Sequence, residues 1–303
     1  MNQIEVMPPL LKDVERKCDS VFLEVNAIHL KSRNIMSSRP ANSTMHRGAI
    51  AIHQVNKVYS NGTVALQDMN LSIGEGEFIS LVGPSGCGKS TALRLIAGLG
   101  QMSAGTIMLG DGQEKPELAF VFQEAALMPW ANVVENVRLP LKLAGVAKLK
   151  SRATVQDAIN LVGLTGFEHS YPRELSGGMK MRVSIARALV TEPNIMLMDE
   201  PFGALDEMTR SKLNSDLLNL WQQKHWTVVF VTHNIYEAVY LSNRVIVMAP
   251  RPGRVVADIT VDAPYPRRSD FRTSRICNEY CREVSARLTE AVTGFSGETA
   301  GVP

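Results

Sequence analysis

A short glycine-rich segment, GPSGCGKST at residues 83–91, constrains the fold of this chain more than any other stretch. It follows the nearly continuous apolar run EFISLVG at 77–83, which is typical of a buried strand, and it precedes the helical pattern STALRLIAGLG. The spacing matches G-x-x-x-x-G-K-[ST], in which glycines let backbone N–H groups surround phosphate oxygens. A strand, this loop and a helix together predict nucleotide binding on an α/β fold.

Each residue type in this loop has an expected task. Lys89 supplies a point charge for the β- and γ-phosphates, and the Ser90 hydroxyl is placed to bind Mg²⁺. The predicted nucleotide-binding residues are Gly83, Pro84, Ser85, Gly86, Cys87, Gly88, Lys89, Ser90 and Thr91. Cys87 is most simply a small side chain that fits. Because a helix N-terminus lowers the pKa of a nearby thiol, we also expect that alkylation of Cys87 blocks nucleotide binding.

The composition is that of an ordinary globular protein. The 303 residues are 45% hydrophobic and 20% charged with a formal net charge of +2, so no basic surface for nucleic acid is indicated. The apolar runs are too short to span a bilayer, and no signal-peptide core is present. Four cysteines in a chain of this length indicate no disulfide framework. We therefore expect a cytoplasmic protein that reaches a membrane only through a partner.

The apolar patterns divide the chain into three regions. Residues 1–47 contain PP and SSRPANST and lack periodicity, which favours a disordered extension or a start codon set too early, before Met45. From 48 to 275 strand and helix patterns alternate, which predicts a parallel sheet covered by helices, with a helical insert at about 124–176. Residues 276–303 are predicted to form a C-terminal helix and tail.

Polar side chains follow three apolar strands of the predicted sheet. Asp199 and Glu200 end IMLMDE, Gln123 ends LAFVFQ, and His233 follows TVVFVT. Ligands of open α/β sheets bind beyond the carboxyl ends of the strands. We predict that Asp199 holds Mg²⁺ through water and that Glu200 polarises the water that attacks the γ-phosphate. Gln123 is predicted to contact Mg²⁺, and His233 to hydrogen-bond the γ-phosphate and the attacking water. A polar residue at the end of a single strand is ordinary. The phosphate loop in the same predicted sheet favours a functional interpretation of these four residues.

A second phosphate-binding end lies further along the chain. The segment LSGGMKMRVSIARAL at 175–189 places a serine and two glycines before a helical pattern. A helix N-terminus offers free N–H groups and a partial positive charge, so it also suits a phosphate. The simpler interpretation is a helix cap at Ser176.

In their order, these motifs resemble those of the nucleotide-binding subunits of ATP-binding cassette (ABC) transporters. The resemblance covers about residues 50–259 and includes LSGGM, IMLMDEP and GALD at 203–206. It implies a P-loop ATPase fold with a mixed sheet core, an antiparallel β subdomain and a helical insert subdomain. It also implies that Tyr59 stacks on adenine and that Asp206 contributes to the nucleotide site.

The resemblance explains why one chain has two phosphate-binding ends. In the family two subunits pack head to tail, so that Ser176, Gly177 and Gly178 of one chain close over the γ-phosphate of ATP held by the other. The implied catalytic residues are Lys89, Gln123, Glu200 and His233, and the implied Mg²⁺ ligands are Ser90, Gln123 and Asp199. The implied partners are a second copy, an integral-membrane permease and, indirectly, a periplasmic substrate-binding protein, with the chain peripheral on the cytoplasmic face of the inner membrane.

Two positions depart from the family pattern. Met179 and Met181 stand where glutamine is common, and methionine cannot donate the hydrogen bonds of an amide. Related import ATPases often have methionine at the first position, so we expect an active site. The second departure indicates a lowered hydrolysis rate.

Secondary signatures point to one group within the family. ALMPWANVVENV at 126–137, GGM, and VMAPRPGRVV at 247–256 resemble the nitrate, sulfonate and taurine importers. The first of these segments would contact the permease, and the implied cargo is a small oxidised anion or an organosulfur compound. The alternative is a non-transport ABC ATPase that acts on nucleic acid or ribosomes. Its usual marks, two cassettes or a long coiled coil, do not occur here. Cys277 and Cys281, four apart on a predicted helix, are a weak candidate for a metal pair.

Overall fold

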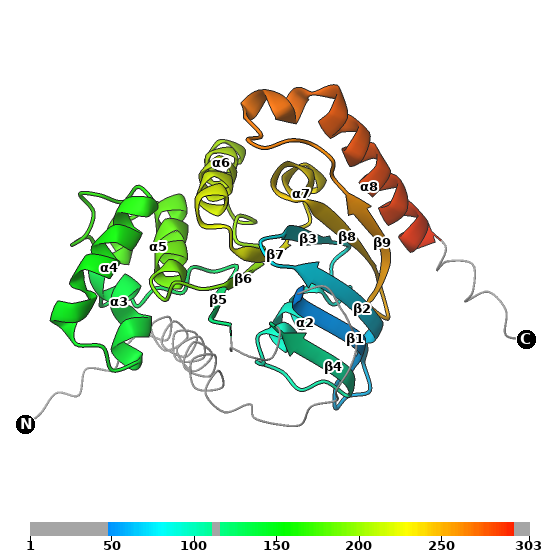
Figure 1. Ribbon diagram of the computed structural model, residues 1–303, viewed down its shortest axis with the longest axis horizontal. Coiled ribbons are helices and arrows are strands. Elements are labelled where there is room, and N and C mark those ends of the chain that lie inside the picture. Colours follow the sequence, from blue (N-terminus) through cyan, green and yellow to red (C-terminus); the bar gives the residue numbers. More distant parts are fainter. Residues whose placement is uncertain (1–47, 111–115, 294–303) are drawn as a thin grey trace, which may run out of the picture. The chain divides into compact units, whose positions relative to one another are not determined.

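The computed structural model describes residues 48–110 and 116–293 (Figure 1). The extension expected at residues 1–47 and the tail from residue 294 lie outside the described residues. The chain divides into two compact units. Among the described residues, the smaller unit comprises 124–191, and the larger one comprises 48–110, 116–123 and 192–293.

The larger unit contains a six-stranded sheet with the strand order β5-β6-β7-β3-β8-β9. Neighbours from β5 to β8 are parallel, and β9 pairs antiparallel with β8. The strands are β3 (Phe78–Val82), β5 (Leu118–Val121), β6 (Ile195–Asp199), β7 (Thr227–Val231), β8 (Arg244–Ala249) and β9 (Arg254–Thr260). All residues of β3 and β7 are buried, as expected for central strands of a sheet with both faces covered. The predicted mixed sheet is confirmed.

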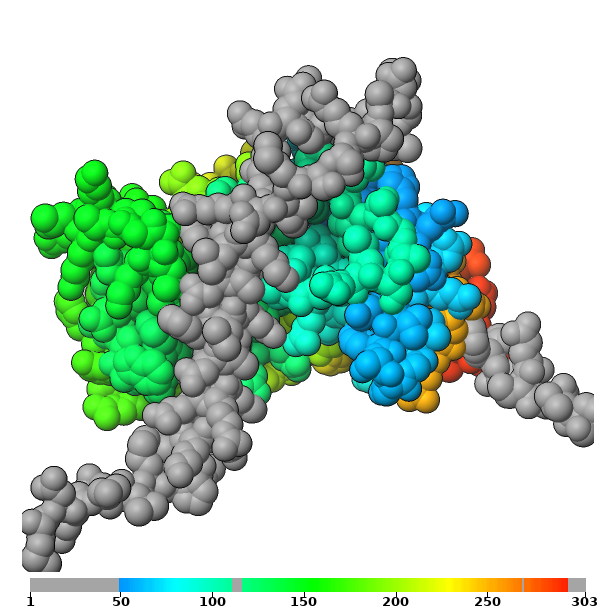
Figure 2. Space-filling model, turned by 90° about the horizontal axis from the view of Figure 1, so that it is seen from below, coloured from blue at the N-terminus to red at the C-terminus, as the bar shows by residue number. Residues whose placement is uncertain are grey.

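A second sheet of this unit has three antiparallel strands in the order β2-β1-β4. They are β1 (Gly48–Val58), β2 (Val64–Gly74) and β4 (Ala104–Leu109). The turn between β1 and β2 contains Gly62, which has a φ of 82° and donates its N–H to the Tyr59 carbonyl. The helix α2 (Lys89–Ile96) contacts β2 as well as β6 and β7, so it lies between the two sheets. In Figure 2 the blue atoms of the first strands reach the surface.

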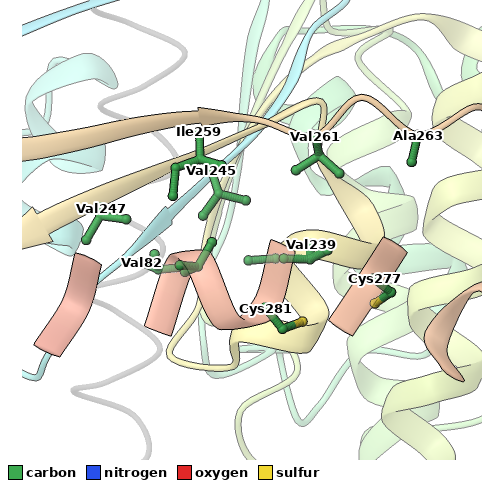
Figure 3. Packing of buried hydrophobic residues seen from close by; sticks show 11 residues of the cluster. Val82, Val239, Val245, Val247, Ile259, Val261, Ala263, Cys277 and Cys281 are labelled. Carbon is green, nitrogen blue, oxygen red and sulfur yellow. The ribbon is translucent and has the colours of Figure 1, made fainter. Parts of the chain in front are cut away.

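The remaining helices of the larger unit are α6 (Glu207–Lys224), α7 (Ile235–Leu241), the 3-10 helix η2 (Ser269–Thr273) and α8 (Arg275–Thr293). In Figure 1, α7 and α8 lie beside β8 and β9. Cys277 and Cys281 are buried in a cluster with Val245, Val247 and other apolar side chains, as Figure 3 shows. No group of three or more possible metal ligands occurs among the described residues. The two thiols are therefore part of an apolar core.

The smaller unit is helical. Its elements are α3 (Val133–Leu143), α4 (Lys148–Leu161), the 3-10 helix η1 (Pro172–Glu174) and α5 (Gly177–Leu189). Asn132 caps α3 by accepting the Glu135 N–H, and Ser176 caps α5 by accepting the Met179 N–H. Across residues 48–110 and 116–293, no helix combines the length and the apolar character needed to cross a bilayer.

Candidate nucleotide site

The phosphate loop connects the carboxyl end of β3 to the start of α2. Gly88 is the N-cap of α2 and has a φ of 92°, a left-handed conformation that favours glycine. A Cβ on Gly83 would lie 2.6 Å from the Cys87 Sγ and 2.7 Å from the Met248 carbonyl oxygen. The loop therefore has no room for a side chain at Gly83, and the predicted order of strand, loop and helix is confirmed.

Lys89 is folded back onto this loop. The residue is only 5% exposed, and its Nζ donates to the carbonyl oxygens of Gly83 at 2.8 Å and of Pro84 at 3.1 Å. These bonds hold the ammonium group inside the curve of the loop. A fixed cation there complements the backbone N–H groups at the start of α2, and both attract phosphate oxygens.

Ser90 and Asp199 meet although they are far apart in the sequence. The Ser90 Oγ donates to the Asp199 Oδ1 at 2.8 Å. Burial raises the pKa of the Asp199 carboxyl, and the neighbouring charge of Glu200 acts in the same direction, whereas the Ser90 hydrogen bond lowers it. A hydroxyl and a carboxylate side by side are oxygen donors of the kind that Mg²⁺ prefers. The pair therefore fits the predicted Mg²⁺ site.

Glu200, His233 and Gln123 converge on the same edge of the sheet. The Glu200 Oε2 lies 3.3 Å from the His233 Nδ1, and the two side chains are 23% and 58% exposed. A Cβ placed on Gly203 would lie 3.7 Å from both the Glu200 Oε2 and the Gln123 Nε2, so these two groups flank one point. The structure thus brings together a carboxylate, an imidazole and an amide. A half-buried carboxylate with a solvent-accessible imidazole beside it is suited to proton transfer to and from water.

Tyr59 directly follows β1, and its side chain reaches the start of α2. Its hydroxyl is 3.2 Å from the Thr91 Oγ1, the residue is 44% exposed, and the Lys57 Nζ is 5.0 Å from the ring centroid. An exposed aromatic face beside the phosphate loop is available for stacking on a base. Its contact with adenine stays a prediction.

Two substitutions of Tyr59 separate the contribution of its ring to ATP binding from that of its hydroxyl. We expect Tyr59→Ala to raise the Kd for ATP about tenfold or more, because stacking of a base on an aromatic ring contributes ~1–3 kcal/mol. Tyr59→Phe keeps the ring and loses only the Thr91 contact, so its effect should be clearly smaller. Titration of both variants with a fluorescent ATP analogue measures the difference, and equal losses would show that the hydroxyl, not stacking, matters.

The remaining predicted site residues lie at helix starts in this structure. Ser176 is exposed at the start of α5, next to Gly177 and Gly178, and belongs to the smaller unit. Asp206 caps α6 by accepting the Thr209 N–H at 3.0 Å, and this bond lowers the pKa of its carboxyl. Contacts of these residues with nucleotide stay predictions.

The expectation of a lowered pKa for the Cys87 thiol is wrong. Cys87 is fully buried, and burial raises the pKa of its thiol, which outweighs the opposing effect of the nearby Lys89 ammonium. Burial of a thiol disfavours the charged thiolate, and this effect is the larger one here despite the helix N-terminus and the nearby ammonium group. Cys87 is therefore a small packing residue, and the effect of its alkylation on nucleotide binding stays a prediction.

Sequence reasoning missed a contact between the turn after β8 and the phosphate loop. A Cβ on Gly253 would lie 2.2 Å from the Cys87 carbonyl oxygen and 2.6 Å from that of Ala65. The Gly253 N–H donates to the Ala65 carbonyl, and the Gln67 N–H donates to the Gly253 carbonyl. The turn thus packs directly against the backbone of the phosphate loop at Cys87. The sequence signal that could have indicated this contact is Gly253 in APRPGRV, which the sequence analysis used only as part of a family signature.

We expect Gly253→Ala to raise the Kd for ATP about tenfold or more, because the added methyl group displaces the backbone of the phosphate loop and small misplacements at such sites are costly. Gly74→Ala is the matched control, since its Cβ would lie 3.4 Å from the Glu77 side chain, an ordinary contact. Calorimetric titration with ATP compares the two. Equal affinities in both variants would contradict the supporting role of the turn.

Comparison with known proteins agrees with this geometry. Residues 66–203 match the family model described as ABC transporter. The aliphatic sulfonates import ATP-binding protein SsuB of Bacillus cereus is 47% identical over 224 residues, 72% of this chain and 88% of that protein. An uncharacterized ABC transporter ATP-binding protein of Methanocaldococcus jannaschii is 44% identical over 250 residues, 80% of this chain and 92% of that protein. This chain belongs to the ABC transporter ATP-binding proteins.

Two solved structures of one bacterial ABC transporter cassette are similar to this chain. The dimeric structure of a bacterial ABC transporter cassette is 33% identical, covers 71% of this chain and all of its own, and has a TM-score of 0.61. The same values hold for the dimer of that cassette in a post-hydrolysis state with ADP and Pi. The chain is accordingly an ATPase whose reaction is coupled to transport.

Proposed function

We propose that this ABC ATPase drives import of a small oxidised anion or organosulfur compound, of the nitrate, sulfonate or taurine type. The observation that supports the coupling chemistry is the convergence of Lys89, Ser90, Asp199, Glu200 and His233 at one edge of the sheet. Support for the cargo class comes from the aliphatic sulfonates import proteins among its relatives.

In the proposed reaction the chain binds Mg-ATP. Lys89 and the N–H groups at the start of α2 hold the β- and γ-phosphates, and Ser90, Asp199 and Gln123 hold Mg²⁺, which neutralises charge on the phosphates. Glu200 accepts a proton from the attacking water. His233 orients that water and the γ-phosphate, since its Nδ1 lies beside the Glu200 carboxylate.

The site is completed by a second copy in the proposed assembly. Ser176, Gly177 and Gly178 at the start of α5 close over the γ-phosphate of the partner's ATP, using a helix N-terminus as the anion site. Asp206, the N-cap of α6, contributes to the nucleotide site. The dimer binds an integral-membrane permease on the cytoplasmic face of the inner membrane, and a periplasmic protein delivers the cargo. ATP then joins the two copies, and hydrolysis separates them.

The proposal is tested by gentle solubilisation of membranes from the native host and identification of proteins that co-purify with the tagged full chain. A multi-span permease is expected. The cargo follows from radiolabelled uptake of sulfonate, taurine and nitrate by cells with and without the chain. Ribosomal or DNA-bound proteins in place of a permease would overturn the transport proposal, and unchanged uptake of all three compounds would overturn the cargo class.

A further inference from the structure

A buried carboxylate next to the site has no task in the reaction described above. Glu237 lies in the first turn of α7 and is only 5% exposed. Charged side chains are rarely buried without a reason, because their desolvation is costly. Its contacts therefore indicate what it does for the fold and the reaction.

On one side Glu237 holds the turn that carries His233. The Glu237 Oε2 accepts from the Thr232 Oγ1 at 2.5 Å, and the same Oγ1 accepts the Asn234 N–H at 3.0 Å. The Asn234 Oδ1 in turn accepts the Glu237 N–H at 3.1 Å. These three bonds form a closed ring around residues 232–237. His233 lies between two members of the ring, so the ring sets the direction of its backbone.

On its other side the carboxyl lies near α6. Burial raises the pKa of Glu237, while the Thr232 hydroxyl and the Arg210 charge lower it. The Arg210 Nη2 donates to the Leu205 carbonyl at 2.9 Å, which fixes the guanidinium at the start of α6. The carboxyl thus has a hydroxyl in hydrogen-bond contact, and the charge of Arg210 acts on it from the start of α6.

His233 has little packing of its own to hold it. Its side chain is 58% exposed and lies 3.3 Å from the Glu200 Oε2. An exposed imidazole that must stay beside one carboxylate depends on its backbone for orientation. The Glu237 Oε1 and both amide atoms of Asn214 are buried without a hydrogen-bond partner, so the network has no surplus bonds to replace one that is lost.

We propose that Glu237 is a positioning residue for ATP hydrolysis, which acts through Thr232 to hold the His233 imidazole beside Glu200. This inference rests on the proposed role of His233 and deepens it. Glu237 touches neither substrate nor reacting atoms. Its effect is on the rate of the chemical step, while the phosphate loop that binds ATP is left as it is.

The test compares two valine substitutions, one at the first residue of β7 and one at the residue directly after its end. Thr232→Val removes the hydroxyl that bonds Glu237, and Thr227→Val removes a buried hydroxyl that accepts the Gly76 N–H at 3.0 Å at the other end of the strand. We expect kcat of the purified full chain to fall about tenfold to hundredfold in Thr232→Val, with the KM for ATP within about twofold, because small misplacements of an acid–base group are costly. Thr227→Val should keep the wild-type kcat.

Two further variants test the bond between Thr232 and Glu237. Glu237→Leu replaces the hydrogen-bond acceptor by an apolar side chain and should lower kcat as Thr232→Val does. Thr232→Ser keeps the hydroxyl and should retain most of the rate. Thermal unfolding of each variant identifies any that is not folded at the assay temperature. Equal rates in Thr232→Val, Glu237→Leu and Thr227→Val would overturn the proposal.

A double substitution separates this inference from the proposed role of His233. If Thr232 acts through the imidazole, Thr232→Val should cause no further loss of kcat in a His233→Ala background. A full additional loss in that background would show that the network acts by another route and would overturn the inference. If His233→Ala alone hydrolyses ATP at the wild-type rate, the role of His233 fails and the inference fails with it.

Discussion

Glu200→Gln should reduce kcat for ATP hydrolysis about a hundredfold or more, because loss of a positioned general base typically costs about 10²–10⁴-fold. Glutamine keeps the size of the side chain and a hydrogen-bonding oxygen near the His233 Nδ1, but it does not accept the proton. The contacts of Lys89 and Ser90 are untouched, so the Kd for ATP should stay near that of the wild type. Steady-state phosphate release and calorimetric ATP titration measure the two quantities.

The variant should also accumulate as an ATP-bound dimer, since the step proposed to separate the copies is blocked. Sedimentation with and without ATP reports this. Glu279→Gln is a suitable control, because Glu279 is an exposed glutamate of α8 that pairs with Arg275 at the surface. Wild-type turnover in Glu200→Gln would remove Glu200 from the role of base.

The same substitution has a consequence for pH dependence. The Glu200 charge raises the pKa of Asp199, in addition to the larger effect of burial. Glutamine at 200 therefore lowers the Asp199 pKa. Because only the deprotonated carboxyl binds Mg²⁺ well, Mg²⁺-dependent ATP binding should persist to lower pH in Glu200→Gln than in the wild type. An unchanged midpoint would contradict the electrostatic coupling of the two carboxyls.

Much of the sheet and of the site could be predicted from the sequence because the signals are local. Short apolar runs identify central strands, and the residue that directly follows each run must lie at the carboxyl edge of a parallel sheet. This reasoning places Asp199, Glu200, Gln123 and His233 at one edge without knowledge of any contact. The phosphate loop is equally local, since its strand and helix are its immediate neighbours.

The features that could not be predicted depend on contacts between distant segments. The raised pKa of Cys87 follows from its burial within the phosphate loop, where β8 packs on the backbone of Gly83, and no sequence pattern near Cys87 indicates this burial. Glu237 has the sequence context of an ordinary polar residue in a first helical turn. Its burial against α6 arises only when α6 and α7 pack against each other.

Lys89→Ala is expected to raise the Kd for ATP about thirtyfold or more, since truncation of one partner of a buried, hydrogen-bonded charge pair costs ~2–5 kcal/mol. Two effects add in the same direction. The phosphates lose their cation, and the carbonyl oxygens of Gly83 and Pro84 lose the donor that keeps the loop curved. Saturating ATP, which raises the unfolding temperature of the wild type by binding the folded state, should leave that of Lys89→Ala unchanged.

The choice of control makes this result specific to the phosphate loop. Lys212 is an exposed lysine of α6, so Lys212→Ala changes the net charge equally without touching the loop and should keep the ATP-induced shift in unfolding temperature. Lys89→Arg keeps the charge but replaces a compact ammonium by a planar guanidinium, which does not fit the same two carbonyls. It should bind ATP more weakly than the wild type but better than Lys89→Ala if charge matters most. Undiminished ATP affinity in Lys89→Ala would contradict the nucleotide-binding assignment of the loop itself.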